Sequence, residues 1–259
     1  MNETPLHFKT ITEVADLIKS KALSPVELTE AMLNRIQAQD SKFKSYITVM
    51  AAQARTSAQS AERAIAAGNY QGPLHGVPIA VKDLCFTKGV ATMGGTKALI
   101  NHIPDFDCTV VERLNAAGAI ILGKLNLTEG AMAGYNPEFQ VPVNPWGSNL
   151  WSGASSSGSG VATAAGLCYG SLGSDTGGSI RFPSAACGIV GLKPTWGRVS
   201  RYGVLALAES LDHIGPMTRS AADAGIILQA MAGLDPNDPT TLPASVPDML
   251  DGIDGGVRG

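Results

Sequence analysis

A short segment rich in glycine and serine places a hydroxyl group among backbone N–H groups that no side chain covers. Residues 173–183 read GSDTGGSIRFP, with Ser179 directly after two glycines. A ligand can therefore approach the N–H groups of Thr176, Gly177, Gly178 and Ser179 closely. Such a set of donors is what a developing oxyanion requires. A tight turn between a strand and a helix, with Ser179 as the helix N-cap, explains the same residues equally well.

A nucleophilic serine needs a base, because its hydroxyl is a weak nucleophile at neutral pH. Among the histidines only His213, next to Asp212, is a candidate, but neighbours in a chain seldom face each other and no G-x-S-x-G motif occurs. Lys82 is the other candidate. It ends the apolar run 77–81, and a buried strand would carry its amine into the interior, where desolvation lowers the pKa. The competing interpretation of Lys82 is a surface ion pair with Asp83.

A second glycine- and serine-rich segment, residues 152–160, reads SGASSSGSG. By composition it is typical of a flexible linker. Its flanks favour a structured loop, because NPWG at 144–147 predicts a turn and residues 161–166 predict a helix. A loop that ends at a helix N-terminus directs several N–H groups at one point. No G-x-x-x-x-G-K-[ST] occurs, and no G-x-G-x-x-G follows a predicted strand, so nucleotide binding is a minor alternative.

The elements that would position these residues are helices first and then alternating strands and helices. Ser24-Pro25-Val26-Glu27 matches a capping box, which predicts a helix from Pro25. The alanine-rich run 50–67 predicts another helix, stopped at Gly68. Beyond residue 73, short apolar runs at 77–81 and 119–122 and a helical stretch at 108–117 predict an α/β layer around a buried sheet.

Composition excludes several classes of protein. The chain has 259 residues, 44% of them hydrophobic and 16% charged, which is enough apolar material for a sizeable core. A net charge of −3 does not favour direct nucleic-acid binding. The four cysteines are too widely spaced for a metal knuckle, so we expect reduced core residues. With no signal peptide pattern and no apolar run long enough for a membrane span, the prediction is a cytoplasmic protein.

Taken together in their order, these motifs resemble the amidase signature family of serine hydrolases. The matching segments are GVPIAVKD, the glycine/serine loop, GSDTGGSIR, GIVGLKPT and SLDHIGPMTR, at residues 76–83, 152–159, 173–181, 188–195 and 210–219. The resemblance is strong over 73–235 and implies an α/β fold with a mixed sheet covered by helices. It also implies an amidase that cleaves a small-molecule carboxylic amide into an acid and ammonia or an amine, without metal or organic cofactor.

The resemblance assigns a role to each candidate residue. It implies a Ser-Ser-Lys triad with Ser179 as nucleophile, Lys82 as base and Ser155, 24 positions before Ser179, as a bridging serine on a cis peptide. It makes the N–H groups of 176–179 the oxyanion hole. The loop departs from the family pattern G-G-S-S-G-G-S at Ala154 and Ser157, where we expect altered geometry or lowered activity.

The resemblance also bears on organisation and partners. We expect an N-terminal helical region at 1–70, an amidase core at 71–235, and a loop at 236–259 leading into a C-terminal part that this chain lacks, so that the sheet is incomplete at the C-terminus. No membrane partner and no direct nucleic-acid contact are expected, and a homodimer is compatible with the pattern. Trp146, Trp151 and Tyr135 either border the site or belong to the core.

Two other functions remain open. One is the A subunit of a glutamine-dependent aminoacyl-tRNA amidotransferase, which shares the triad. Residues 126–135, NLTEGAMAGY, resemble free-standing amidases more than that subunit, where an N-x-D-E-F-A-M-G stretch is expected. The other is a non-catalytic scaffold or an inactive fragment that keeps the amidase fold.

Overall fold

The computed structural model describes residues 4–132 and 134–256 and is built around one six-stranded mixed sheet. The strand order is β1-β3-β2-β4-β6-β5. Strand β2 runs parallel to β3 and β4, and the remaining pairs are antiparallel. The predicted α/β fold with a mixed sheet is thus confirmed. The strands are β1 (Tyr46–Val49), β2 (Pro78–Lys82), β3 (Ile120–Leu125), β4 (Gly170–Asp175), β5 (Val190–Gly191) and β6 (His213–Thr218).

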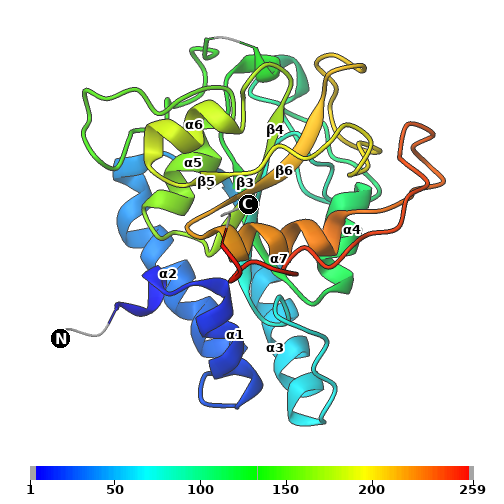
Figure 1. Cartoon of the computed structure of the whole chain (residues 1–259). Helices are drawn as coiled ribbons and strands as arrows, with labels where there is room; N and C mark the ends of the chain where they lie inside the picture. The colour runs from blue at the N-terminus through cyan, green and yellow to red at the C-terminus, as the bar shows by residue number, and fades with distance from the viewer. Residues whose placement is uncertain (1–3, 133, 257–259) are drawn as a thin grey trace.

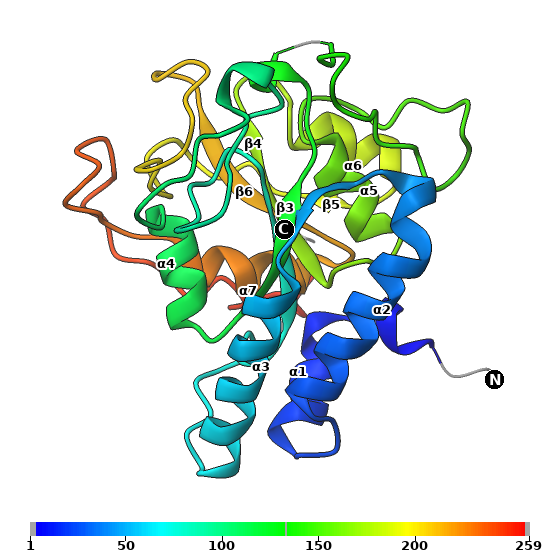
Figure 2. The same ribbon diagram turned by 180° about the vertical axis from the view of Figure 1, so that it is seen from behind.

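The helices surround this sheet. Helix α7 lies across the front of the sheet in Figure 1, whereas α2 and α3 lie in front when the molecule is turned (Figure 2). The α-helices are α1 (Ile11–Lys19), α2 (Pro25–Phe43), α3 (Ala51–Ala66), α4 (Thr109–Ala116), α5 (Ser157–Ala164), α6 (Arg181–Cys187) and α7 (Ala221–Met231), and the short 3₁₀ turns are Leu6–Phe8, Lys97–Leu99 and Glu129–Ala131.

Local sequence explains where the first helices begin. Helix α2 begins at Pro25 as predicted, and the Ser24 hydroxyl accepts from the N–H groups of Val26 and Glu27. The predicted capping box is only half formed, because among the described residues the Glu27 side chain accepts no hydrogen bond from the Ser24 N–H. The Ser24 hydroxyl donates to Glu62 of α3. A complete capping box occurs instead at the start of α1, where Thr10 and Glu13 bond reciprocally.

One strand within the first 70 residues escaped the sequence prediction. Strand β1 lies between α2 and α3 and pairs with β3, so the N-terminal region contributes an edge strand to the central sheet. Only four residues long and partly exposed, it carries no long apolar run. The division at residue 70 remains a prediction. At the other end, residues 236–256 contain neither helix nor strand.

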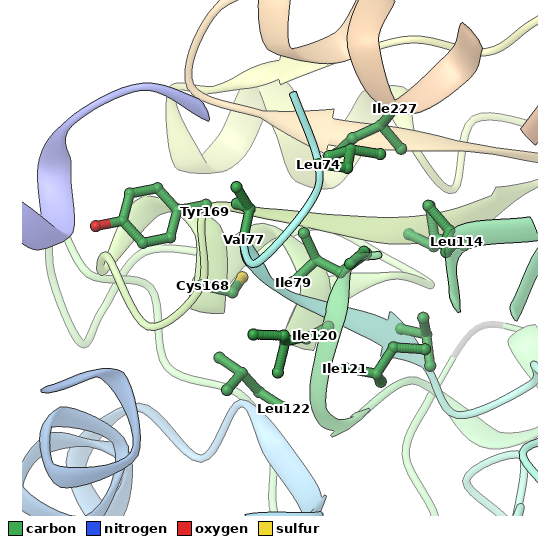
Figure 3. Packing of buried hydrophobic residues seen from close by; sticks show 14 of the residues in the cluster. Leu74, Val77, Ile79, Leu114, Ile120, Ile121, Leu122, Cys168, Tyr169 and Ile227 are labelled. Atoms are coloured by element: carbon green, nitrogen blue, oxygen red, sulfur yellow. The ribbon is translucent and has the colours of Figure 1, made fainter. Parts of the chain in front are cut away.

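The core lies on both faces of β2 and β3, whose residues are all buried. Figure 3 shows Ile79 of β2, Ile120 of β3 and Ile227 of α7 gathered in one cluster with Tyr169. The Tyr169 hydroxyl donates to the carbonyl of Leu6 at 2.6 Å, so its polar end is satisfied. Strands buried on both faces read as continuous apolar runs, which is why these two could be predicted.

The four cysteines are free and buried, as predicted. Among the described residues no helix is both long and apolar enough to cross a bilayer. Within the same ranges, no group of three or more His, Cys, Asp or Glu side chains is arranged to hold a metal ion.

Candidate active site

The candidate base, Lys82, is buried at the centre of the sheet. It ends β2, which lies between β3 and β4, and its side chain is 1% exposed. Its Nζ lies 2.7 Å from Ser155 Oγ, 2.9 Å from Ser156 Oγ and 2.8 Å from Ser174 Oγ. An amine without water thus has three hydroxyl partners, which offsets part of the cost of its burial.

Burial makes Lys82 a usable base near neutral pH. Loss of water around the amine lowers the pKa of Lys82 from its ordinary value of 10.5 to about 7, against the opposing effects of Cys85, Asp175 and Asp212. A general base works best when its pKa lies near the operating pH. At pH 7 a large share of Lys82 is therefore neutral and able to accept a proton.

The competing interpretation of Lys82, a surface ion pair with Asp83, is wrong. Asp83 pairs with Lys124, whose Nζ lies 3.1 Å from its Oδ1, and both side chains are fully buried. The same amine donates to the carbonyl of Cys85 and to Thr92 Oγ1, each at 2.7 Å. Lys82 therefore forms its hydrogen bonds with the three serines and not with Asp83.

The glycine/serine loop is part of the core and not a linker. Ser155, Ser156, Ser157 and Ser159 are at most 1% exposed, and α5 begins at Ser157, inside the serine run. The peptide bond between Ala154 and Ser155 is cis, as the resemblance implies. The loop therefore brings the Ser155 hydroxyl directly onto the amine of Lys82.

The candidate nucleophile, Ser179, lies in the turn between β4 and α6, partly exposed. It is not the N-cap, because that position belongs to Ile180 and no side chain caps the helix. The N–H of Ser156 donates to the Ser179 carbonyl at 3.2 Å, which ties the two loops together. No hydrogen bond joins Ser179 Oγ to Ser155 Oγ among the described residues.

Asp175, at the end of β4, organises the turn around Ser179. Its carboxylate accepts from the N–H groups of Gly178 at 2.8 Å and Ile180 at 3.1 Å, and from the guanidinium of Arg181 at 2.9 and 3.0 Å. Burial raises the pKa of Asp175, but the hydrogen bonds from Arg181 and these N–H groups outweigh it and hold the pKa below its usual value.

This arrangement corrects one member of the predicted oxyanion hole. The Gly178 N–H is already bonded to Asp175, so it is not available to an incoming ligand. Within residues 4–132 and 134–256, the N–H groups of Thr176, Gly177 and Ser179 have no hydrogen-bond acceptor. Three of the four predicted donors therefore remain open beside the candidate nucleophile.

His213 takes no part in a Ser-His-Asp arrangement. Its Nδ1 lies 3.1 Å from the Asp175 carbonyl, and its Nε2 lies 3.1 Å from Lys193 Nζ. The neighbouring Asp212 accepts from Thr176 Oγ1 at 2.5 Å, and its other oxygen accepts from the N–H of Leu207 at 2.8 Å. Both residues support the loops around Ser179, and the His-based alternative has no structural basis.

The structure places two further serines in the site that the sequence analysis did not single out. Ser156 and Ser174 contact Lys82, and the Ser156 hydroxyl also donates to the Ser174 carbonyl at 3.2 Å. Ser156 belongs to the SSS run and Ser174 precedes Asp175, so both lie within motifs already identified. The signal that could have found them is the need of a buried amine for three acceptors.

The aromatic residues near the loop have different roles. The Tyr135 hydroxyl donates to Ser157 Oγ at 2.6 Å. Ser157 is one of the two positions where the glycine/serine loop departs from the family pattern, so this departure provides the acceptor. Trp146 is 68% exposed, and its Nε1 donates to the Cys187 carbonyl. Trp151 is 62% exposed and its ring lies 6.4 Å from that of Phe182. None of the three belongs to the buried core.

A groove of about 430 Å³ opens beside this cluster. Ser174, which contacts Lys82, and Asp212, which contacts Thr176, both line it. The other lining residues are Leu84, Trp196, Arg201, Tyr202, Val204, Leu205, Ala206, Leu207, Glu209, Ser210, Ile214, Asn237, Asp238 and Thr240.

Comparison with known proteins places this chain in a family. The family model described as Amidase matches residues 27–254. The chain belongs to the amidase family. It is 54% identical over 248 residues to the Mycobacterium tuberculosis protein AmiD, named as an amidase, with 96% of this chain and 52% of AmiD aligned.

Two further relatives frame the functional question. The A subunit of the glutamyl-tRNA(Gln) amidotransferase from Geobacter metallireducens is 50% identical over 252 residues, covering 96% of this chain and 52% of its relative. The crystal structure of the peptide amidase from Stenotrophomonas maltophilia superposes with a TM-score of 0.88 at 38% identity, over 94% of this chain and 51% of that enzyme. The chain spans about half the length of the relatives it matches.

Proposed function

We propose that this member of the amidase family hydrolyses carboxylic amides through Ser179, Ser155 and Lys82. The observation that carries the proposal is the buried amine of Lys82, 2.7 Å from Ser155 Oγ and with a pKa of about 7. The similarity of the chain to AmiD and to a peptide amidase supports the same reaction class. The proposed substrate is a small-molecule amide, and the reaction needs no metal or organic cofactor.

Acylation begins with attack of Ser179 Oγ on the amide carbonyl carbon. The Ser179 proton passes to Ser155 Oγ while Ser155 gives its own proton to neutral Lys82, because a hydroxyl can donate and accept at once. We expect the two hydroxyls to come within hydrogen-bonding distance when substrate binds, since catalytic hydrogen bonds are often long in structures without substrate and shorten in the complex. The carbonyl oxygen becomes an oxyanion.

The oxyanion would be held by the N–H groups of Thr176, Gly177 and Ser179. Donors fixed in position before the reaction stabilise developing charge without reorganising, which is the basis of oxyanion-hole catalysis. Asp175 contributes indirectly, because its bonds to Gly178 and Ile180 fix the turn that carries these donors. We therefore assign Asp175 and Gly178 to positioning.

Collapse of the tetrahedral intermediate breaks the C–N bond. Lys82, now an ammonium, returns its proton through Ser155 to the leaving nitrogen, which departs as ammonia or an amine. Water then attacks the Ser179 ester, its proton passes to Ser155 and Lys82, and collapse of the second intermediate returns a proton to Ser179 and releases the carboxylic acid. Each step leaves the three side chains as they began.

The decisive experiment combines amide hydrolysis with labelling by a fluorophosphonate probe. Replacement Ser179→Ala is expected to lower kcat/KM by about 10⁴-fold or more and to abolish labelling. Ser57→Ala, an exposed serine of α3, is the matched control and should change neither. Turnover retained in Ser179→Ala would overturn the assignment. Failure of the probe to label folded protein would favour the scaffold interpretation.

The A subunit of a tRNA-dependent amidotransferase is the second candidate, favoured by 50% identity to the Geobacter metallireducens protein. Co-purification separates the two, because such a subunit is expected to arrive with partner chains and a free amidase to arrive alone. A preference for glutamine as the amide substrate would also favour the amidotransferase subunit. We propose a cytoplasmic location on the grounds that four buried free cysteines suit a reducing compartment.

A further inference from the structure

The groove beside Ser174 borders the site at two points. Ser174 Oγ lies 2.8 Å from the amine of Lys82, and Asp212 Oδ1 lies 2.5 Å from the hydroxyl of Thr176. The backbone N–H of Thr176 is one of the open oxyanion donors. Both Ser174 and Asp212 line the groove. A group lying in it would therefore be attached to a carbonyl held between the base and the oxyanion loop. None of Lys82, Ser155 and Ser179 is itself part of the lining, so the groove adjoins the reacting groups through Ser174 and Asp212.

The surface of the groove is chiefly apolar in area, although half of its lining residues are polar or charged. Aliphatic side chains contribute to it from three separate segments of the chain, and two exposed aromatic side chains, Trp196 at 36% and Tyr202 at 42%, are part of it. The aliphatic residues are Leu84, Val204, Leu205, Leu207 and Ile214. Such a surface binds hydrocarbon by removing it from water.

The charges in the groove do not favour an anion. Its one cation, Arg201, donates to Thr240 Oγ1 at 2.8 Å and to the Glu209 carbonyl, stacks 5.1 Å over the ring of Trp196, and lies 4.0 Å from Asp238. Three carboxylates, those of Glu209, Asp212 and Asp238, line the same groove. A substrate carboxylate would meet an excess of negative charge, and both terminal nitrogens of Arg201 are already engaged, which leaves only its buried Nε without a hydrogen bond.

We propose that this groove is the acyl pocket and that it takes an uncharged alkyl or aryl chain, excluding substrates with a carboxylate at the far end of the acyl group. The inference rests on the proposed amidase function and adds its substrate class. An apolar chain gains about fourfold in kcat/KM for each methylene group that the groove buries. Hexanamide is thus favoured over acetamide, and over the monoamide of adipic acid, which has a terminal carboxylate.

The test uses four amides and two positions of the chain. Ala206 lines the groove and is exposed, so its replacement disturbs no core. Ala206→Trp should fill the groove and lower the ratio of kcat/KM for hexanamide to kcat/KM for acetamide at least tenfold. Ala206→Arg should raise the ratio of kcat/KM for adipic monoamide to kcat/KM for hexanamide at least tenfold. Ala67, exposed at the end of α3, provides the matched controls Ala67→Trp and Ala67→Arg, which should alter neither ratio.

An isomer of hexanamide distinguishes the acyl side from the leaving-group side. N-butylacetamide carries the alkyl chain on nitrogen, and the ratio of its kcat/KM to that of acetamide should be the same in Ala206→Trp as in the wild-type protein. Loss of N-butylacetamide turnover with hexanamide unaffected would overturn the assignment of the groove to the acyl chain. A wild-type preference for adipic monoamide, or equal losses on hexanamide and acetamide, would overturn the inference as well.

Probe labelling keeps this inference separate from the function on which it rests. If Ser179 is labelled and acetamide is hydrolysed while the Ala206 variants behave like the Ala67 variants, only the acyl pocket is wrong. If Ser179 is not labelled and no amide is turned over, the proposed function fails and the acyl pocket fails with it.

Discussion

Replacing Ser174 by alanine should move the pH dependence of amide hydrolysis to lower pH. Lys82 must be neutral to accept a proton, so kcat/KM should rise with pH and level off above a midpoint near 7, the pKa that burial confers on Lys82. At pH 6 the wild-type protein should reach about a tenth of its plateau. Ser174 Oγ accepts a hydrogen bond from this amine at 2.8 Å and so stabilises its charged form.

The size of the shift follows from that single bond. A hydrogen bond to a charged group contributes about 1.5–3 kcal/mol, and 1.36 kcal/mol corresponds to one pH unit. Because the lost bond favours the ammonium, Ser174→Ala lowers the pKa of Lys82, and the midpoint should fall by about 1 to 2 pH units. At pH 6 the variant should then retain half or more of its own plateau value.

The assay is kcat/KM for acetamide from pH 4.5 to 9, since acetamide is too short to occupy the groove that Ser174 also lines. Ser171→Ala is the matched control, because Ser171 is buried on the same strand but bonds to Thr163 and to the Ser159 carbonyl. Its midpoint should stay near 7. A midpoint that is unchanged or raised in Ser174→Ala, or lowered equally in Ser171→Ala, would refute the assignment of the midpoint to Lys82.

Two predictions concern stability, measured as free energies of unfolding in urea. Tyr135→Phe and Ser157→Ala should each cost about 1–3 kcal/mol, since each leaves a partner of a 2.6 Å hydrogen bond unpaired, and the double variant should cost less than the sum of both; additive costs would show that the pair does not interact. Lys124→Met should cost about 3–5 kcal/mol, because it strands the buried carboxylate of Asp83, and adding Asp83→Leu should recover much of the loss. No recovery would contradict an ion-pair origin.

The central strands could be predicted because strands that are buried on both faces consist of apolar residues. Residues 77–81 and 119–122 are apolar throughout, as strands covered on both faces must be, and they became β2 and β3 with small shifts of their ends. Strand β1 carries no such signal, because YITV is short and only partly buried. Its place in the sheet depends on pairing with β3, about 75 positions further along the chain, which local patterns do not encode.

The donor set around Ser179 shows a second limit of local reasoning. The absence of side chains at Gly177 and Gly178 predicts backbone that a ligand can approach, but it does not say which N–H groups are free. That depends on the Asp175 carboxylate, which turns back from the end of β4 onto Gly178. A carboxylate two residues before a pair of glycines can accept from the turn or face solvent, and only the fold around Arg181 and Ile180 decides between them.

The surroundings of Lys82 depend on contacts that are remote in sequence but constrained by chemistry. Ser155 and Ser174 lie 73 and 92 positions away, and they meet the amine because β2 pairs in parallel with β4 and the glycine/serine loop packs beside them. Placing the amine in the core already requires polar partners for it, since an unpaired buried amine is costly. The demand for further acceptors was therefore implicit in the sequence. Their identity was not, because SSS at 155–157 offers three hydroxyls and only the start of α5 at Ser157 turns the third toward Tyr135.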